Sequence, residues 1–211
     1  MKKIFALWVL IGLANFVSAQ ENTSLKKYID SLYESDQQEQ WTLKRLIENN
    51  APIDSIERQE KIKKQVFERN IPLIKDIYAR YGYPTIQLVG KESSKNFFVL
   101  IQHADSDVAF QKSMLPILKR HAEKGSIALK DYAYLYDRVH RNMGGKQLYG
   151  TQLTFNKNGS LFDKDNKISY PPDLDDPAGV DKRRKKMGLE PLETYYESVL
   201  SALGKPRKNK Q

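Results

Sequence analysis

The sequence contains no cysteine. Disulfide bonds, thiol catalysis and a cysteine-linked lipid anchor are therefore excluded, so the folded chain must depend on an apolar core for its stability. The motifs G-x-S-x-G, H-E-x-x-H, the P-loop and G-x-G-x-x-G are also missing. We therefore expect no cofactor, and no single motif names a reaction.

Long apolar runs are scarce, and the one long run lies at the N-terminus. Lys2 and Lys3 precede an apolar stretch at residues 4–17, and Val17-Ser18-Ala19 fits a small-x-small cleavage site. This pattern predicts a signal peptide at residues 1–19 and export to the periplasm or beyond. An uncleaved membrane anchor is the alternative, but Asn15 interrupts the stretch. We expect no stable membrane insertion after cleavage.

Acidic residues are outnumbered by basic ones, which gives a formal net charge of +9. The surplus is local, because five positive charges are consecutive from Lys182 to Lys186 and four more lie in the tail at residues 204–211. A nucleic-acid groove would spread its basic residues along an element with aromatic residues between them. We expect solvated charges and no nucleic-acid partner. Binding of the basic helix to an acidic envelope polymer remains an alternative.

Apolar residues at helical spacing dominate the first half of the chain. They predict helices from Ser24 onward, near residues 41–47, and from about Asp54 to Tyr81. Residues 85–90 alternate like a brief strand or an extended connector. Residues 91–104 fit either a helix or a buried strand, because both types of element can contain an apolar run of this length.

The second half changes its period. We predict helices near residues 105–125 and 126–144, and then an antiparallel β-hairpin, because Tyr149, Thr151, Leu153 and Phe155 alternate before Asn158-Gly159. An ordered loop and two helices, at 180–187 and 191–203, should follow. The predicted fold class is mainly α (α+β): a single helical domain at residues 20–203 with a small β-hairpin, followed by a disordered basic tail.

Polar residues follow directly on the most apolar segment. Residues 97–101 must be buried, so they hold Gln102, His103 and Asp105 at the edge of the core. This junction is the candidate site.

Three motifs support a family resemblance: Gln102-His103-Ala104-Asp105, Asp137-Arg138-Val139 and Tyr149-Gly150-Thr151-Gln152. In this order they resemble an uncharacterised bacterial family, domain of unknown function 6624, over roughly residues 71–196. Tyr83 and Phe98 stand where the family pattern has tryptophan, and both keep an aromatic ring. The resemblance implies a helix at residues 91–104, and it implies no established activity, substrate or cofactor.

His103 is the candidate general acid or base, if a carboxylate orients its ring. Asp137 is the preferred partner and Asp105 the other, so the candidate catalytic residues are His103, Asp105 and Asp137. The alternatives are structural. His103 would be a histidine at the edge of the core with a carbonyl partner, Asp105 would cap a helix, and Asp137 would pair with Arg141 on a solvated face.

Polar side chains near these residues are candidates for ligand binding. Arg138 has the planar fork that binds carboxylate or phosphate, and Gly150 allows a close approach beside Gln152. The candidate ligand-binding residues are Gln102, Arg138, Gln147, Tyr149, Thr151 and Gln152. We expect no metal, because one histidine with carboxylates is a poor zinc set.

Two functional interpretations follow from these candidates. The first is a site around His103 for a small polar or anionic ligand, with hydrolysis as one reaction that these groups would support. The second is a non-catalytic structural or interaction module of the cell envelope, in which the same groups hold the helices and the hairpin together. The sequence does not indicate an oligomeric state.

Overall fold

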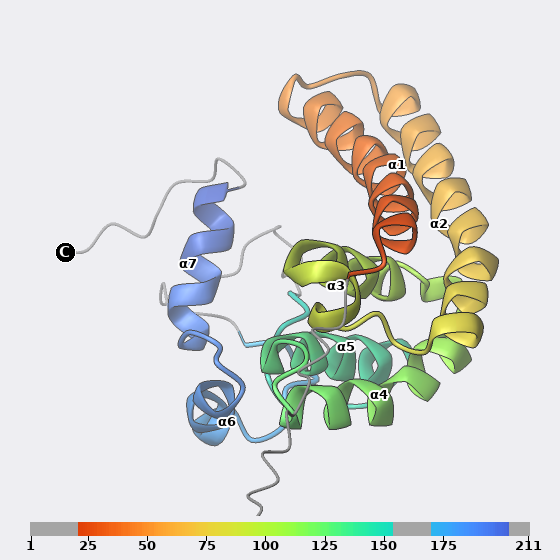
Figure 1. The fold of residues 1–211 in the computed structure, drawn as a ribbon. Coiled ribbons are helices and arrows are strands. Elements are labelled where there is room, and N and C mark those ends of the chain that lie inside the picture. Colours follow the sequence, from red (N-terminus) through yellow and green to blue (C-terminus); the bar gives the residue numbers. More distant parts are fainter. Residues whose placement is uncertain (1–20, 154–169, 203–211) are drawn as a thin grey trace, which may run out of the picture.

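A computed structural model describes residues 21–153 and 170–202 (Figure 1). The predicted signal peptide, the distal part of the predicted hairpin and the basic tail lie outside the described residues. Within the described ranges the chain is mainly helical, which confirms the main part of the predicted fold class. The helices are α1 (Thr23–Glu48), α2 (Ile53–Tyr81), α3 (Ile86–Gln102), α4 (Val108–Glu123), α5 (Leu129–Asn142), α6 (Val180–Lys186) and α7 (Leu192–Ala202).

Helices α1 and α2 lie side by side as a long antiparallel pair that extends away from the rest of the molecule (Figure 1). Asn22 caps α1 by accepting the backbone N–H of Leu25 at 2.9 Å. We predicted two helices in the α1 region, separated by the polar stretch at residues 34–40, but α1 is continuous. One residue of that stretch, Asp36, is buried and belongs to the inward face of the helix.

Helix α3 lies centrally and packs against both α1 and α2. Its Phe97 and Ile101 side chains are fully buried. Residues 91–102 form the helix that the family resemblance implied, and the helix ends two residues before the predicted end at residue 104. The helical region begins earlier than we predicted, since residues 86–89 are helical rather than a strand or a connector. Gly90 then interrupts the helical backbone with φ 78°, a conformation that favours glycine.

Helices α4 and α5 form a second antiparallel pair beneath α3 (Figure 1). Asp107 caps α4 by accepting the N–H of Phe110 at 2.9 Å. The two pairs share one core with α3, built around Ile29, Ile74, Leu118 and Leu135.

The predicted β-hairpin is wrong for the described residues, because residues 149–153 form no strand. Two local causes are visible. Gly150 has φ 63°, which breaks an extended backbone, and Asp137 takes up the N–H groups of Leu148 and Thr151. The part of the prediction beyond residue 153 lies outside the described residues.

A smaller apolar cluster joins α6 and α7 to the preceding loop. Its buried members are Leu174, Val180, Leu192, Tyr196 and Leu200. None of the described helices is long and apolar enough to cross a membrane.

Candidate functional site

The imidazole of His103 is bound to a buried carboxylate from α1. His103 directly follows the last residue of α3, and its Nδ1 atom lies 2.8 and 2.9 Å from the two carboxylate oxygens of Asp36. Asp36 is fully buried. Phe67 of α2 stacks on the imidazole, with ring centroids 4.4 Å apart and an angle of 12° between the planes. The ring is therefore fixed in position and orientation by two other helices.

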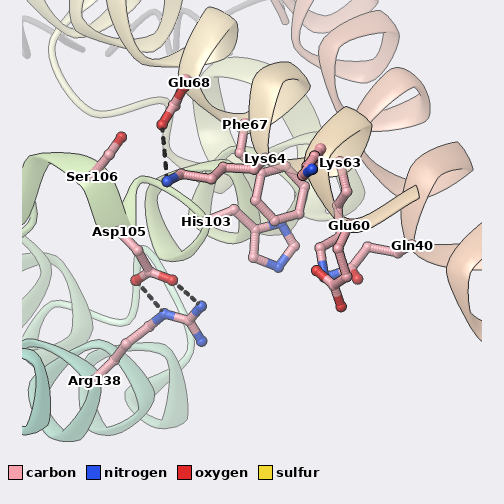
Figure 2. Close-up of a pocket in the computed structure, with 11 residues that line it drawn as sticks. Gln40, Glu60, Lys63, Lys64, Phe67, Glu68, His103, Asp105, Ser106 and Arg138 are labelled. Carbon is pink, nitrogen blue, oxygen red and sulfur yellow. Dashed lines mark hydrogen bonds and ion pairs between the residues drawn. The ribbon is translucent and has the colours of Figure 1, made fainter. Parts of the chain in front are cut away.

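His103 lines an open cavity of about 430 Å³ (Figure 2). Helix α2 supplies most of one wall, and the other residues come from α1, the end of α3, the turn after α3, and α5. Since Asp36 occupies Nδ1, the nitrogen left for the cavity is Nε2, which forms no hydrogen bond with any residue that the structure describes. The lining residues are Gln40, Glu60, Lys61, Lys63, Lys64, Phe67, Glu68, His103, Asp105, Ser106 and Arg138.

The contact with Asp36 bears on the tautomer of His103. An ionised carboxylate only accepts hydrogen bonds, so Nδ1 of a neutral His103 ring donates to Asp36 when it carries the ring proton. Nε2 then has the free lone pair that a general base requires.

Asp105 and Arg138 form a bidentate pair on the cavity wall (Figure 2). Arg138 donates from Nε at 2.7 Å and from Nη2 at 2.5 Å. Gln111 and Asn142 also donate to Asp105, at 3.2 and 3.0 Å. Burial opposes the ionisation of Asp105, but the Arg138 hydrogen bonds and charge outweigh it, so the pKa of Asp105 lies below its usual value. Asp107, not Asp105, caps α4.

Asp137 contacts a loop rather than His103. Its fully buried carboxylate accepts the N–H of Leu148 at 2.8 Å, the N–H of Thr151 at 2.9 Å and the Thr151 hydroxyl at 3.0 Å. It also accepts the N–H of Tyr149. Burial raises the pKa of Asp137, and these hydrogen bonds only partly offset the effect. We therefore correct the expected carboxylate partner of His103 from Asp137 or Asp105 to Asp36.

Arg184 binds the same loop at a carbonyl group. It is fully buried and donates from Nη1 to the carbonyl of Tyr149 at 2.6 Å, while its guanidinium lies over the Tyr195 ring. The Tyr149 backbone thus lies between a buried carboxylate and a buried guanidinium. We call this arrangement, Asp137 and Arg184 on the loop Leu148–Thr151, the Asp137 clamp.

Gln147 and Gln152 extend the clamp toward the cavity. The Gln147 side chain accepts the N–H of Gln152 at 2.9 Å and donates to the Gln152 carbonyl at 3.0 Å. The side chain of Gln152 accepts a weak bond from Arg138 at 3.4 Å. Gln152 therefore connects the clamp to the cavity wall through Arg138.

The structure divides the candidate residues into two groups. His103, Asp105 and Arg138 line the cavity. Asp137, Gln147, Tyr149 and Thr151 are buried and hold the loop, and Gln152 lies between the groups. Gln102 is half-buried next to His103 and is not among the cavity-lining residues.

Sequence reasoning did not identify Asp36, Phe67 or the lysines of α2 as site residues. A signal for Asp36 was present, because Leu25, Ile29, Leu32 and Asp36 follow one helical stripe. A carboxylate that continues an apolar stripe needs a buried partner. No comparable signal marked the lysines. Among the described residues, no group of histidines and carboxylates is arranged to hold a metal ion.

The fold and the site together define a class: a mainly helical protein with a histidine–carboxylate pair at the edge of an open polar cavity. The chain belongs to the family of unknown function DUF6624, whose model matches residues 23–208. This match is longer than the resemblance at residues 71–196, and it includes α1 and α2 with Asp36 and Phe67. No curated protein and no solved structure matches the chain.

Proposed function

We propose that the protein is a hydrolase in which His103 acts as the general base on a small polar substrate bound in the cavity. One observation carries the proposal: Asp36 binds Nδ1 of His103, which leaves Nε2 for the cavity that the ring lines. General bases are commonly held in this way, with one ring nitrogen bound to a carboxylate and the other free for the reaction.

The proposed reaction follows from this geometry. Nε2 takes a proton from a water molecule while the water oxygen attacks the carbonyl carbon or the phosphorus of an ester. Asp36 stabilises the imidazolium that forms, and Lys61 or Lys64 stabilises the negative charge that develops on the substrate oxygen. The imidazolium then returns its proton to the leaving oxygen as the ester bond breaks. One water molecule is consumed, and an acid and an alcohol are released.

Hydrolysis of p-nitrophenyl acetate, p-nitrophenyl phosphate and bis(p-nitrophenyl) phosphate tests the proposal. We expect turnover of at least one ester, and a loss of about 100-fold or more in His103→Gln, because general base catalysis contributes about 10²–10⁴. His140→Gln is the matched control, since His140 bonds the carbonyl of Tyr136 and does not line the cavity. No turnover of any ester, or turnover that a folded His103→Gln variant retains, would contradict the proposal.

A second candidate function is favoured by the Asp137 clamp. Most residues of the second and third family motifs hold a loop and are buried. In a non-catalytic module, the Asp36–His103 pair would equally serve to join α1 to α3. Thermal unfolding separates the two functions: His103→Gln should melt close to the unsubstituted protein if the pair serves catalysis, and well below it if the pair serves stability.

A further inference from the structure

We propose that the ligand of the cavity is a small anion, with a phosphate or carboxylate group held by the lysines of α2. The inference rests on the proposed function only for the role of His103, because the cationic wall is a separate observation. It specifies the chemical class of substrate for that site.

Cationic side chains line the cavity from two sides. Lys61, Lys63 and Lys64 come from α2. Figure 2 shows Arg138 of α5 on the other side of the cavity from Lys63 and Lys64. Glu60, Lys63, Lys64 and Phe67 follow helical spacing, so Lys63 and Lys64 lie on the face of α2 that also carries the ring stacked on His103. Lys61 lines the cavity from a neighbouring position on the same helix. A ligand against this face would contact the lysine ammonium groups and lie beside Nε2.

The carboxylates that line the cavity already pair with cationic side chains. Glu60 accepts an ion pair from Lys63 at 2.6 Å, Glu68 is 3.8 Å from Lys64, and Asp105 is bound by Arg138. Lys61 forms no ion pair with any residue in the described ranges. A cationic ligand would have to displace one of these side chains from its carboxylate. An anion can pair with Lys61 directly and can also contact Lys64, whose ion pair with Glu68 is long and exposed.

Arg138 sets one edge of the anion site. Two of its nitrogens bind Asp105, and Nη1 has only the 3.4 Å bond to Gln152. Arg138 therefore cannot provide a full bidentate fork while Asp105 holds it, and the lysines are the main anion ligands. A cavity of about 430 Å³ suits a small metabolite rather than a polymer segment.

Titration of the full chain with inorganic phosphate, and separately with malonate, tests this inference. Amide chemical shifts of the cavity residues would be followed by NMR at constant ionic strength. We expect saturable shifts that are confined to the cavity wall, and an affinity about two- to fivefold weaker in each of Lys61→Met and Lys64→Met, as expected for exposed ion pairs. The control is Lys119→Met, an exposed lysine of α4 that does not line the cavity.

The comparison of the two anions identifies the chemical group that the cavity recognises. Binding of phosphate alone indicates a phosphate site, binding of malonate alone indicates a carboxylate site, and binding of both indicates a site for either group. Shifts that a chloride salt reproduces, or affinities that Lys61→Met and Lys64→Met leave unchanged, would overturn the inference. The variant His103→Gln distinguishes a failure of the proposed function from a failure of the anion inference, because it should still bind the anion after losing turnover. Turnover that depends on His103 in a protein that binds neither anion would overturn only the anion inference.

Discussion

Asp137 is a buried carboxylate whose charge is balanced mainly by backbone N–H groups. Its oxygens accept the N–H groups of Leu148, Tyr149 and Thr151 and one hydroxyl, and no lysine or arginine side chain among the described residues pairs with it directly. Removing such an acceptor leaves several buried donors unpaired, which is among the most destabilising changes that a single residue can make.

Asp137→Ala should therefore destabilise the protein strongly. We expect a loss of about 3 kcal/mol or more in the free energy of unfolding, measured by urea denaturation, because four donors lose their acceptor. Asp76→Ala is the matched control. Its carboxylate forms an exposed i,i+4 pair with Arg80, and losing it should cost less than about 1 kcal/mol. Equal effects of the two substitutions would show that the clamp does not stabilise the fold.

Asp131 gives a prediction for pH dependence. Burial near the start of α5 raises the pKa of Asp131 to about 6, despite the opposing charges of Lys130 and Lys95. The unfolded chain loses this proton near pH 4 and the folded chain near pH 6. Stability from this residue is therefore present below about pH 4 and is lost as the pH rises to about 6.

Asp131→Asn should remove that dependence. The amide keeps the shape of the side chain without its charge, so we expect the variant to be more stable than the unsubstituted protein at pH 7, by up to about 3 kcal/mol. The two proteins should converge near pH 4. Unfolding curves at several pH values measure this difference, and a constant difference across pH 4–7 would rule out the raised pKa.

Part of the candidate site could be predicted from the sequence alone. His103 could be identified because it follows a strongly apolar run, and a histidine at the edge of the core is a candidate for a tuned group. Its partner could not be assigned, because Asp36 is 67 positions away and the fold of α1 against α3 decides the contact.

At the scale of elements, the loop Leu148–Thr151 depends on the missing side chain of Gly150. Gly150 has φ 63°, and a Cβ added there would lie 3.0 Å from the Leu192 side chain of α7. The loop, the clamp and α7 therefore meet at a position that suits only glycine.

Gly150→Ala should cost more than backbone strain alone. We expect a loss of about 2 kcal/mol or more in the free energy of unfolding, because the alanine is strained and also overpacked against Leu192. Gly82→Ala provides the comparison. Gly82 has a similar φ of 68° with no atom within 4 Å of an added Cβ, so it should cost only about 1 kcal/mol. A smaller loss in Gly150→Ala than in Gly82→Ala would contradict the described packing.

The helices were largely predictable because apolar spacing reports a buried helical face directly. The errors arose where one contact overrides a local pattern. Alternation at residues 149–153 is typical of a strand, yet Asp137 binds the N–H groups that a strand partner would need. The polar residues 34–40 suggested a break between helices, yet Asp36 is buried there against His103 and α1 continues.

At the scale of the whole molecule, the candidate site lies where two parts of the chain meet. The α1–α2 pair brings Asp36, Phe67 and the lysines, and the rest of the molecule brings His103, Asp105 and Arg138. Neither part forms the cavity alone. The site could not be predicted in full from the sequence, because the packing of α1 and α2 against α3 determines it.

Two residues of the basic run Lys182–Lys186 make contacts within the protein. Arg183 donates to the carbonyl of Leu148 at 2.7 Å, and Arg184 is buried in the clamp. Lys182, Lys185 and Lys186 are exposed and remain available to solvent or to an acidic partner. The net charge of the sequence therefore overstates the charge that this helix presents.

The tautomer of His103, measured by ¹⁵N NMR of the imidazole nitrogens, tests the central claim most directly. If Asp36 holds Nδ1 and Nε2 serves as the base, the neutral ring must carry its proton on Nδ1. Asp36→Asn should weaken this preference, while the signals of His121 and His140 should stay unchanged. A neutral His103 ring with its proton on Nε2, unaffected by Asp36→Asn, would contradict the account.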